Sequence, residues 1–274
     1  MAMPASADIF AANRARGRIG LTVADMGGET RRARVDEAGS LRVRFPGPKA
    51  RALDAVIVNT AGGIAGGDRF DLDVAVGAGA RLTVTTAAAE KVYRSLGPDS
   101  TIDVRLSIAA GGTLVWLPQE TILFDCARLA RTIDVDLADG ARLVLAEALV
   151  FGRAAMREVV NQGGVRDRWR VRVDGTLRFA ETVRLDGGIA QRLGERAVAA
   201  GGGAIATVLL LPADQTMVEA VRARADDFRG EVGASAWNGL ALMRLVAENG
   251  MALRHDLAAV LAALDVPLPR SWLN

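Results

Sequence analysis

Val74–Leu82 (VAVGAGARL) sets a pattern that returns at Leu106–Leu114 (LSIAAGGTL) and Val135–Leu143 (VDLADGARL), with starts 32 and 29 residues apart. In each copy apolar residues alternate, a glycine-containing turn follows, and an apolar residue closes the stretch. Alternation at a period of two places one face inward, and glycine tolerates the backbone of tight turns. Each copy therefore predicts a β-hairpin. Looser copies lie at Val35–Leu41 and Val171–Leu177.

Repeats of about 30 residues indicate units that stack and bury a shared core. We therefore expect a mainly β protein with a β-helical body of stacked hairpins. An ordinary all-β fold, which contains similar hairpins, is the alternative.

The pattern changes after Pro212. Asp214 is a suitable cap for a helix that runs to about Phe228, and a hairpin is expected over 231–246. A second helix is predicted over Met251–Leu264. This divides the chain into a flexible N-terminus (1–17), a β-rich body (18–211) and a small C-terminal α/β portion (212–274) with two helices.

Charge and composition limit the classes of partner that we expect for this chain. The 274 residues carry 34 basic and 32 acidic side chains, for a net charge of +2. Arginine and acidic residues are interspersed with no evident basic stripe, so nucleic acid is not an expected partner. No signal peptide and no apolar run of about 20 residues is visible, and Cys126 is the single cysteine. We expect a cytoplasmic protein with no membrane partner.

The glycine-rich segment Asn59–Arg69 follows an apolar strand but fits neither a dinucleotide-binding nor a Walker A pattern. The next segment alternates like a strand, whereas a phosphate site needs a helix N-terminus. A glycine-rich crossing between strands is the expected structure.

Catalytic and metal-binding residues are scarce. His255 is the only histidine, and no spacing links it to Ser95 or Cys126 as a catalytic pair. A tight nickel or zinc site usually needs several His or Cys ligands, so any metal contact would rely on carboxylates, carbonyls and water. Asp71 and Asp73 share a strand face, which leaves a carboxylate-based hydrolase or lyase on a β-solenoid as an alternative.

Four segments together resemble the urease accessory protein D (UreD/UreH) family. They are 59–68 (NTAGGIAGGD), 82–95 (LTVTTAAAEKVYRS), 116–129 (WLPQETILFDCARL) and 147–158 (EALVFGRAAMRE). Cys126 departs from the pattern, where a small residue such as glycine is expected. The resemblance implies a chaperone-like maturation factor that is not an enzyme. It would bind apo-urease and the accessory proteins F and G, with GTP hydrolysis on a partner.

The resemblance also implies that nickel is cargo in transit and that no cofactor is tightly bound. Asp68, Glu120 and Glu147 are the predicted transient nickel contacts, with Arg94 and Arg153 to balance their charge. The remaining polar residues of the motifs are Tyr93, Ser95, Asp125 and Glu158. For every one of these residues the alternative is that it holds a strand crossing together by hydrogen bonds.

Overall fold

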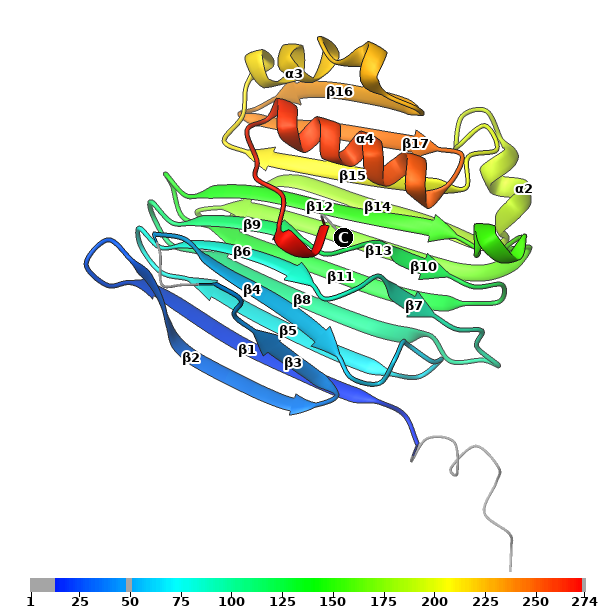
Figure 1. Ribbon diagram of the computed structural model, residues 1–274, viewed down its shortest axis with the longest axis horizontal. Coiled ribbons are helices and arrows are strands. Elements are labelled where there is room, and N and C mark those ends of the chain that lie inside the picture. The colour runs from blue at the N-terminus through cyan, green and yellow to red at the C-terminus, as the bar shows by residue number, and fades with distance from the viewer. Residues whose placement is uncertain (1–12, 48–50, 273–274) are drawn as a thin grey trace, which may run out of the picture.

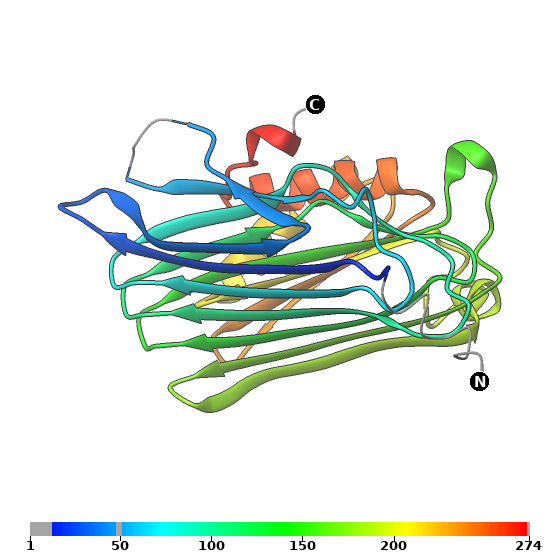
Figure 2. The ribbon, with the colours of Figure 1, turned by 90° about the horizontal axis from the view of Figure 1, so that it is seen from below.

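The computed structural model describes residues 13–47 and 51–272 and shows two stacked β-sheets (Figures 1 and 2). Sheet A has the strand order β14-β13-β11-β8-β5-β1-β2. Its strands are β1 (Arg16–Asp25), β2 (Thr30–Gly39), β5 (Arg69–Val76), β8 (Ser100–Ile108), β11 (Arg128–Leu137), β13 (Gln162–Val173) and β14 (Thr176–Gly188).

Sheet B runs β16-β17-β15-β12-β9-β6-β4-β3, with β10 beside β12 and β7 beside β10. Its strands are β3 (Leu41–Arg44), β4 (Leu53–Asn59), β6 (Arg81–Thr86), β7 (Glu90–Val92), β9 (Thr113–Leu117), β10 (Thr121–Leu123), β12 (Arg142–Phe151), β15 (Ala204–Leu211), β16 (Glu231–Trp237) and β17 (Leu240–Ala247). The mainly β prediction is confirmed.

The repeats are corners rather than hairpins, so that part of the prediction is wrong. Each of the three clear copies leaves a strand of sheet A and enters a strand of sheet B: β5 to β6, β8 to β9, and β11 to β12. The two strands that flank a corner lie in different sheets, and each pairs in parallel with its counterpart in the next repeat. Alternation alone cannot distinguish these arrangements, because the inward face is apolar in both. Val171–Leu177 does form a hairpin, β13–β14.

Stacking places the repeat positions in register and builds the core. Val74 lies beside Leu106, which lies beside Val135, and all three are buried. On sheet B, Leu114 lies between Leu82 and Leu143 in the same way. The expectation of stacked units with a shared core is confirmed.

The C-terminal elements continue sheet B and cover its outer face (Figure 1). As predicted, Asp214 caps a helix, but α3 (Gln215–Arg222) ends before the expected Phe228. Strands β16 and β17 form the expected hairpin, whose turn places Asn238 and Gly239 at positive φ. The second predicted helix is α4 (Gly250–Ala263). A short helix that was not predicted, α2 (Ile189–Gly194), follows β14. The 3₁₀ turns are η1 (Ala154–Met156), η2 (Ala225–Asp227) and η3 (Arg270–Trp272).

Of the N-terminal segment predicted to be flexible, residues 1–12 lie outside the described residues, and Arg16 already belongs to β1. Asn59–Arg69 is a glycine-rich crossing from β4 in sheet B to β5 in sheet A, as predicted. Among the described residues, no helix has the length and apolar character needed to span a bilayer.

Candidate functional site

Three cavities adjoin one another from the surface into the space between the sheets. The outer groove, of about 200 Å³, is lined by the glycine-rich crossing and by residues 86–91. Thr86 and Glu90 also line the central cavity, of about 70 Å³. Arg131 and Glu147 line both the central cavity and the far cavity, of about 20 Å³, which reaches β14 and β15. We call this series the interior passage.

A buried polar cluster occupies the junction of the central and far cavities. Arg131 on β11 forms ion pairs with Glu147 on β12 and Asp167 on β13. Two indoles complete the cluster: Trp116 Nε1 donates to Glu147 Oε1 over 2.9 Å, and Trp169 Nε1 donates to Asp167 Oδ1 over 3.0 Å. All five side chains are buried between the sheets. We call them the buried triad and its two tryptophans.

The stacked register brings these side chains together. Arg131 lies directly beside Asp167 in the parallel β11–β13 pair, and Trp116 lies beside Leu145, two residues before Glu147. Arg131, Glu147 and Asp167 each occupy an inward position that an apolar residue fills elsewhere in the repeats. The cluster therefore interrupts an apolar core with one cation and two carboxyl groups.

Burial is the largest influence on the pKa of Glu147. It raises the pKa of this carboxyl from 4.5 to about 7, and the nearby Asp167 charge adds to the increase, while Arg131 opposes it. Desolvation lowers the pKa of Arg131, but attraction to the two carboxylates outweighs it, so that its pKa rises on balance. Near neutral pH, Glu147 can therefore exchange a proton while Arg131 stays charged.

Glu90 marks the boundary between the outer groove and the central cavity. Desolvation raises its pKa from 4.5 to about 7, and the hydrogen bond from Asn59 Nδ2, 3.2 Å long, opposes the shift. The passage thus holds two carboxyl groups, Glu90 and Glu147, that titrate near neutrality. Groups with shifts of this size often mark functional sites.

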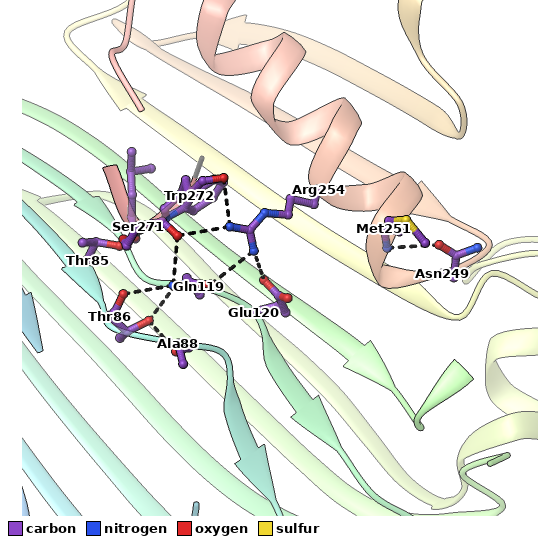
Figure 3. A network of polar contacts seen from close by, with 11 residues as sticks. Thr85, Thr86, Ala88, Gln119, Glu120, Asn249, Met251, Arg254, Ser271 and Trp272 are labelled. Atoms are coloured by element: carbon purple, nitrogen blue, oxygen red, sulfur yellow. Dashed lines mark hydrogen bonds and ion pairs between the residues drawn. The ribbon is translucent and has the colours of Figure 1, made fainter. Parts of the chain in front are cut away.

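Glu120 lies at the margin of the passage, next to Gln119 of the central cavity. Figure 3 shows Arg254 reaching from α4 toward both residues: its Nη1 is 3.3 Å from Glu120 Oε2 and 3.2 Å from Gln119 Oε1. Its Nη2 donates to the carbonyl of Trp272 over 3.1 Å. Glu120 is half-buried, and its ion pair with Arg254 joins α4 to the body. Through the same guanidinium group, the C-terminal segment is joined to the body as well.

Asp68 lies away from the passage. Its carboxylate accepts the backbone amides of Ala15, over 2.8 Å, and Ala65, over 2.7 Å. It lines none of the three cavities. This geometry matches the alternative role for a motif residue, which is to hold a strand crossing.

The other motif residues predicted from the sequence lie in loops that connect strands of the two sheets. Tyr93 donates to the carbonyl of Gly62, and Ser95 to that of Pro98. Arg94 forms a backbone bridge to Ala127. These contacts hold neighbouring loops together, and none of the three residues lines the passage.

Asp125, Arg153 and Glu158 form a second group of loop contacts. Asp125 accepts the backbone amides of Asn161 and Gln162, which lower its pKa. Arg153 pairs with Glu158 at 2.7 Å, which lowers the pKa of that carboxyl. Arg153 is thus committed to Glu158, and the cation that pairs with Glu147 and Asp167 is Arg131.

Cys126 has φ of 63°, in the left-handed region that favours glycine. This explains why a small residue is expected there.

His255 Nδ1 lies 3.1 Å from Asp256, which accepts the backbone amides of Arg229 and Gly230 and so supports a turn. Asp71 and Asp73 share the outward face of β5, as predicted, and line none of the three cavities.

Within the described residues, no group of three or more His, Cys, Asp or Glu side chains is arranged to hold a metal ion. The charged and indole side chains of the passage that the sequence did not predict include Glu90, Trp116, Arg131, Asp167, Trp169 and Glu181. Arg131 and Asp167 carried a usable signal: each takes an inward position within an apolar alternation, Leu129-x-Arg131-x-Ile133 and Val165-x-Asp167-x-Trp169.

Comparison with known proteins identifies the family. A family described as "UreD urease accessory protein" matches residues 15–273. A urease accessory protein UreD from Rhodopseudomonas palustris (strain BisA53) is 58% identical over 266 residues, covering 97% of this chain and 93% of the relative. One from Bradyrhizobium diazoefficiens is 52% identical over 269 residues, covering 98% of each chain. The resemblance noted from the four sequence segments is thereby confirmed, and the chain belongs to the UreD family of urease accessory proteins.

Proposed function

We propose that this chain is a non-catalytic urease maturation factor of the cytoplasm that binds apo-urease and the accessory proteins F and G. Nickel would be its cargo, and GTP hydrolysis would take place on a partner. The observation that carries the proposal is the buried triad at the junction of two cavities, with a titrating carboxyl at the outer boundary. A core built only for stability would fill these inward positions with apolar side chains.

The carboxyl groups suit a divalent ion that passes through. Glu90 and Glu147 offer oxygen ligands, which bind nickel more weakly than histidine or cysteine does. Arg131 keeps a positive charge against Glu147 and Asp167, so an arriving ion competes with the guanidinium for the same oxygens. Such a site holds an ion briefly and releases it.

Protonation gives the ion a means of exchange. A carboxyl group with a pKa of about 7 is partly protonated at neutral pH. An arriving divalent ion favours the ionised form, so its entry releases a proton and its departure recovers one. The ion can thus cross a buried region without leaving an uncompensated carboxylate behind.

Urease activation in cells tests the proposal. Urease subunits, the accessory proteins and nickel are supplied, and urease activity and nickel content are measured with wild type, Glu147→Gln or Asp71→Asn. Both substitutions convert a carboxylate to its amide, but Asp71 faces outward on β5. We expect Glu147→Gln to lower both readouts and Asp71→Asn to leave them unchanged. Full activation by Glu147→Gln would exclude the passage as the route, and activation without this chain would exclude a maturation role.

A further inference from the structure

A row of arginines follows the outer face of β13. Arg166, Arg168, Arg170 and Arg172 alternate with Val165, Asp167, Trp169 and Val171, and the second set is buried between the sheets. The four guanidinium groups therefore all lie on the outer face of sheet A. The expectation that the chain has no basic stripe is wrong here, because the intervening residues that break the stripe in sequence point inward.

Arg184 extends the row onto the edge strand β14. It lies directly opposite Arg166 in the antiparallel pair. Like charges at opposed positions destabilise a sheet. The Arg166–Arg184 pair therefore does not stabilise the fold, whereas binding of an external anionic group would relieve the repulsion between the two guanidinium groups.

The carboxylates nearby neutralise only part of this charge. Asp134 on β11 lies 3.2 Å from Arg168 and 4.0 Å from Arg172. Arg184 reaches Asp186 at 3.7 Å. Within residues 13–47 and 51–272, no carboxylate lies within 4 Å of the guanidinium of Arg166 or Arg170. Arg170 instead donates to the backbone carbonyls of Trp169 and Glu181.

We infer that this arginine row, defined by Arg166, Arg168, Arg170, Arg172 and Arg184, binds a carboxylate-rich surface of a partner protein. A guanidinium group binds carboxylates through two parallel hydrogen bonds. Alternate residues of a strand lie about 6.6–6.8 Å apart, so an acidic strand with the same period can match the row side chain for side chain.

The surrounding charges favour a protein over a nucleic acid. Asp134 and Asp136 on β11 adjoin the row, and Asp103 on β8 and Asp71 on β5 occupy outward positions further across the sheet. A phosphate backbone that crosses sheet A would meet these carboxylates. A protein surface can instead place basic or neutral side chains against them.

Fluorescence anisotropy with a labelled peptide of alternating Glu and Thr tests the inference. The test variant is Arg166→Gln/Arg170→Gln/Arg184→Gln. Its control, Arg34→Gln/Arg81→Gln/Arg196→Gln, loses the same charge at exposed arginines outside the row. Because each exposed ion pair contributes a few-fold in affinity, we expect the test variant to raise the Kd of the peptide about tenfold. We expect the control to change it far less.

Equal weakening by the two variants would overturn the inference, because it would show that only net charge matters. Tighter binding of duplex DNA than of the peptide would overturn it as well. Unfolding midpoints of both variants show whether the fold is retained.

Urease activation separates this inference, which specifies a surface for the proposed function, from that function itself. If wild type activates urease and the test variant does so equally well, the arginine row is not the docking surface. If wild type fails to activate urease, the maturation role fails, and the peptide measurement still decides whether the row binds carboxylates.

Discussion

Replacing Glu147 by glutamine should stabilise the protein at alkaline pH. Burial raises the pKa of this carboxyl in the folded state from 4.5 to about 7. The folded protein therefore binds a proton that the unfolded chain has already lost, and stability falls as pH rises from about 4.5 to about 7. Each tenfold change in proton affinity corresponds to about 1.4 kcal/mol, so ionised Glu147 costs the folded state about 3 kcal/mol above pH 7.

Glutamine mimics the protonated carboxyl and can accept the hydrogen bond of Trp116, so the variant avoids this cost. We expect Glu147→Gln to exceed the free energy of unfolding of wild type by less than about 1 kcal/mol near pH 5 and by about 3 kcal/mol at pH 8. Chemical denaturation at the two pH values measures the difference. Glu120→Gln is the control, because Glu120 pairs with Arg254 at the margin of the passage, and it should change stability by about 1 kcal/mol or less.

The pH dependence of the Glu147→Gln variant distinguishes the effect of burial from that of Arg131 on this carboxyl. If Glu147→Gln destabilises the protein more at pH 8 than at pH 5, the ionised carboxylate is stabilised by Arg131 and burial is not the dominant effect. A variant that is more stable and yet fails to activate urease would show that the carboxyl group serves function at the expense of stability. Loss of activation could then not be attributed to misfolding.

Three further outcomes are expected. Arg131→Met leaves the two carboxyl groups that it pairs buried without a cation and should lower the free energy of unfolding by about 3–5 kcal/mol, with a smaller loss at pH 5 than at pH 8 in chemical denaturation. Glu90→Gln should raise the thermal midpoint more at pH 8 than at pH 5, because the folded state of wild type favours the neutral carboxyl. Cys126→Gly should raise the free energy of unfolding by up to about 1 kcal/mol, since glycine adopts the positive φ without strain, whereas Ala127→Gly should lower it.

Local patterns predicted the elements well and their pairing poorly. The cap at Asp214, the Asn238-Gly239 turn and the alternating strands follow from interactions within a few residues. Whether Val74–Leu82 is a hairpin or a corner depends instead on where the next repeat, 32 residues later, is placed. That information lies in long-range packing, and α2 likewise follows from the place where β14 ends.

The site was predicted only in part for a related reason. Glu147 was identified because it lies in a family motif, whereas its partners Arg131 and Asp167 lie outside the motif segments. Their inward positions follow from the apolar alternation around them, whereas their proximity to each other and to Glu147 becomes evident only from the strand pairing. Asp68 and Asp125 stood out in the same motifs, and their carboxylates accept backbone amides. A motif alone does not distinguish a ligand from a support for a loop.

The position of β15 has a practical consequence for protein preparation. This strand pairs with β12 on one side and β17 on the other, and its buried side chains Ala206 and Val208 pack with Leu257 of α4. A truncation after Leu211 would keep β15 but remove β17, which pairs with one of its edges, and α4, which packs on it, leaving an unpaired apolar edge. Such a fragment is expected to aggregate on expression, so deletion mapping of partner contacts requires point substitutions in the intact chain.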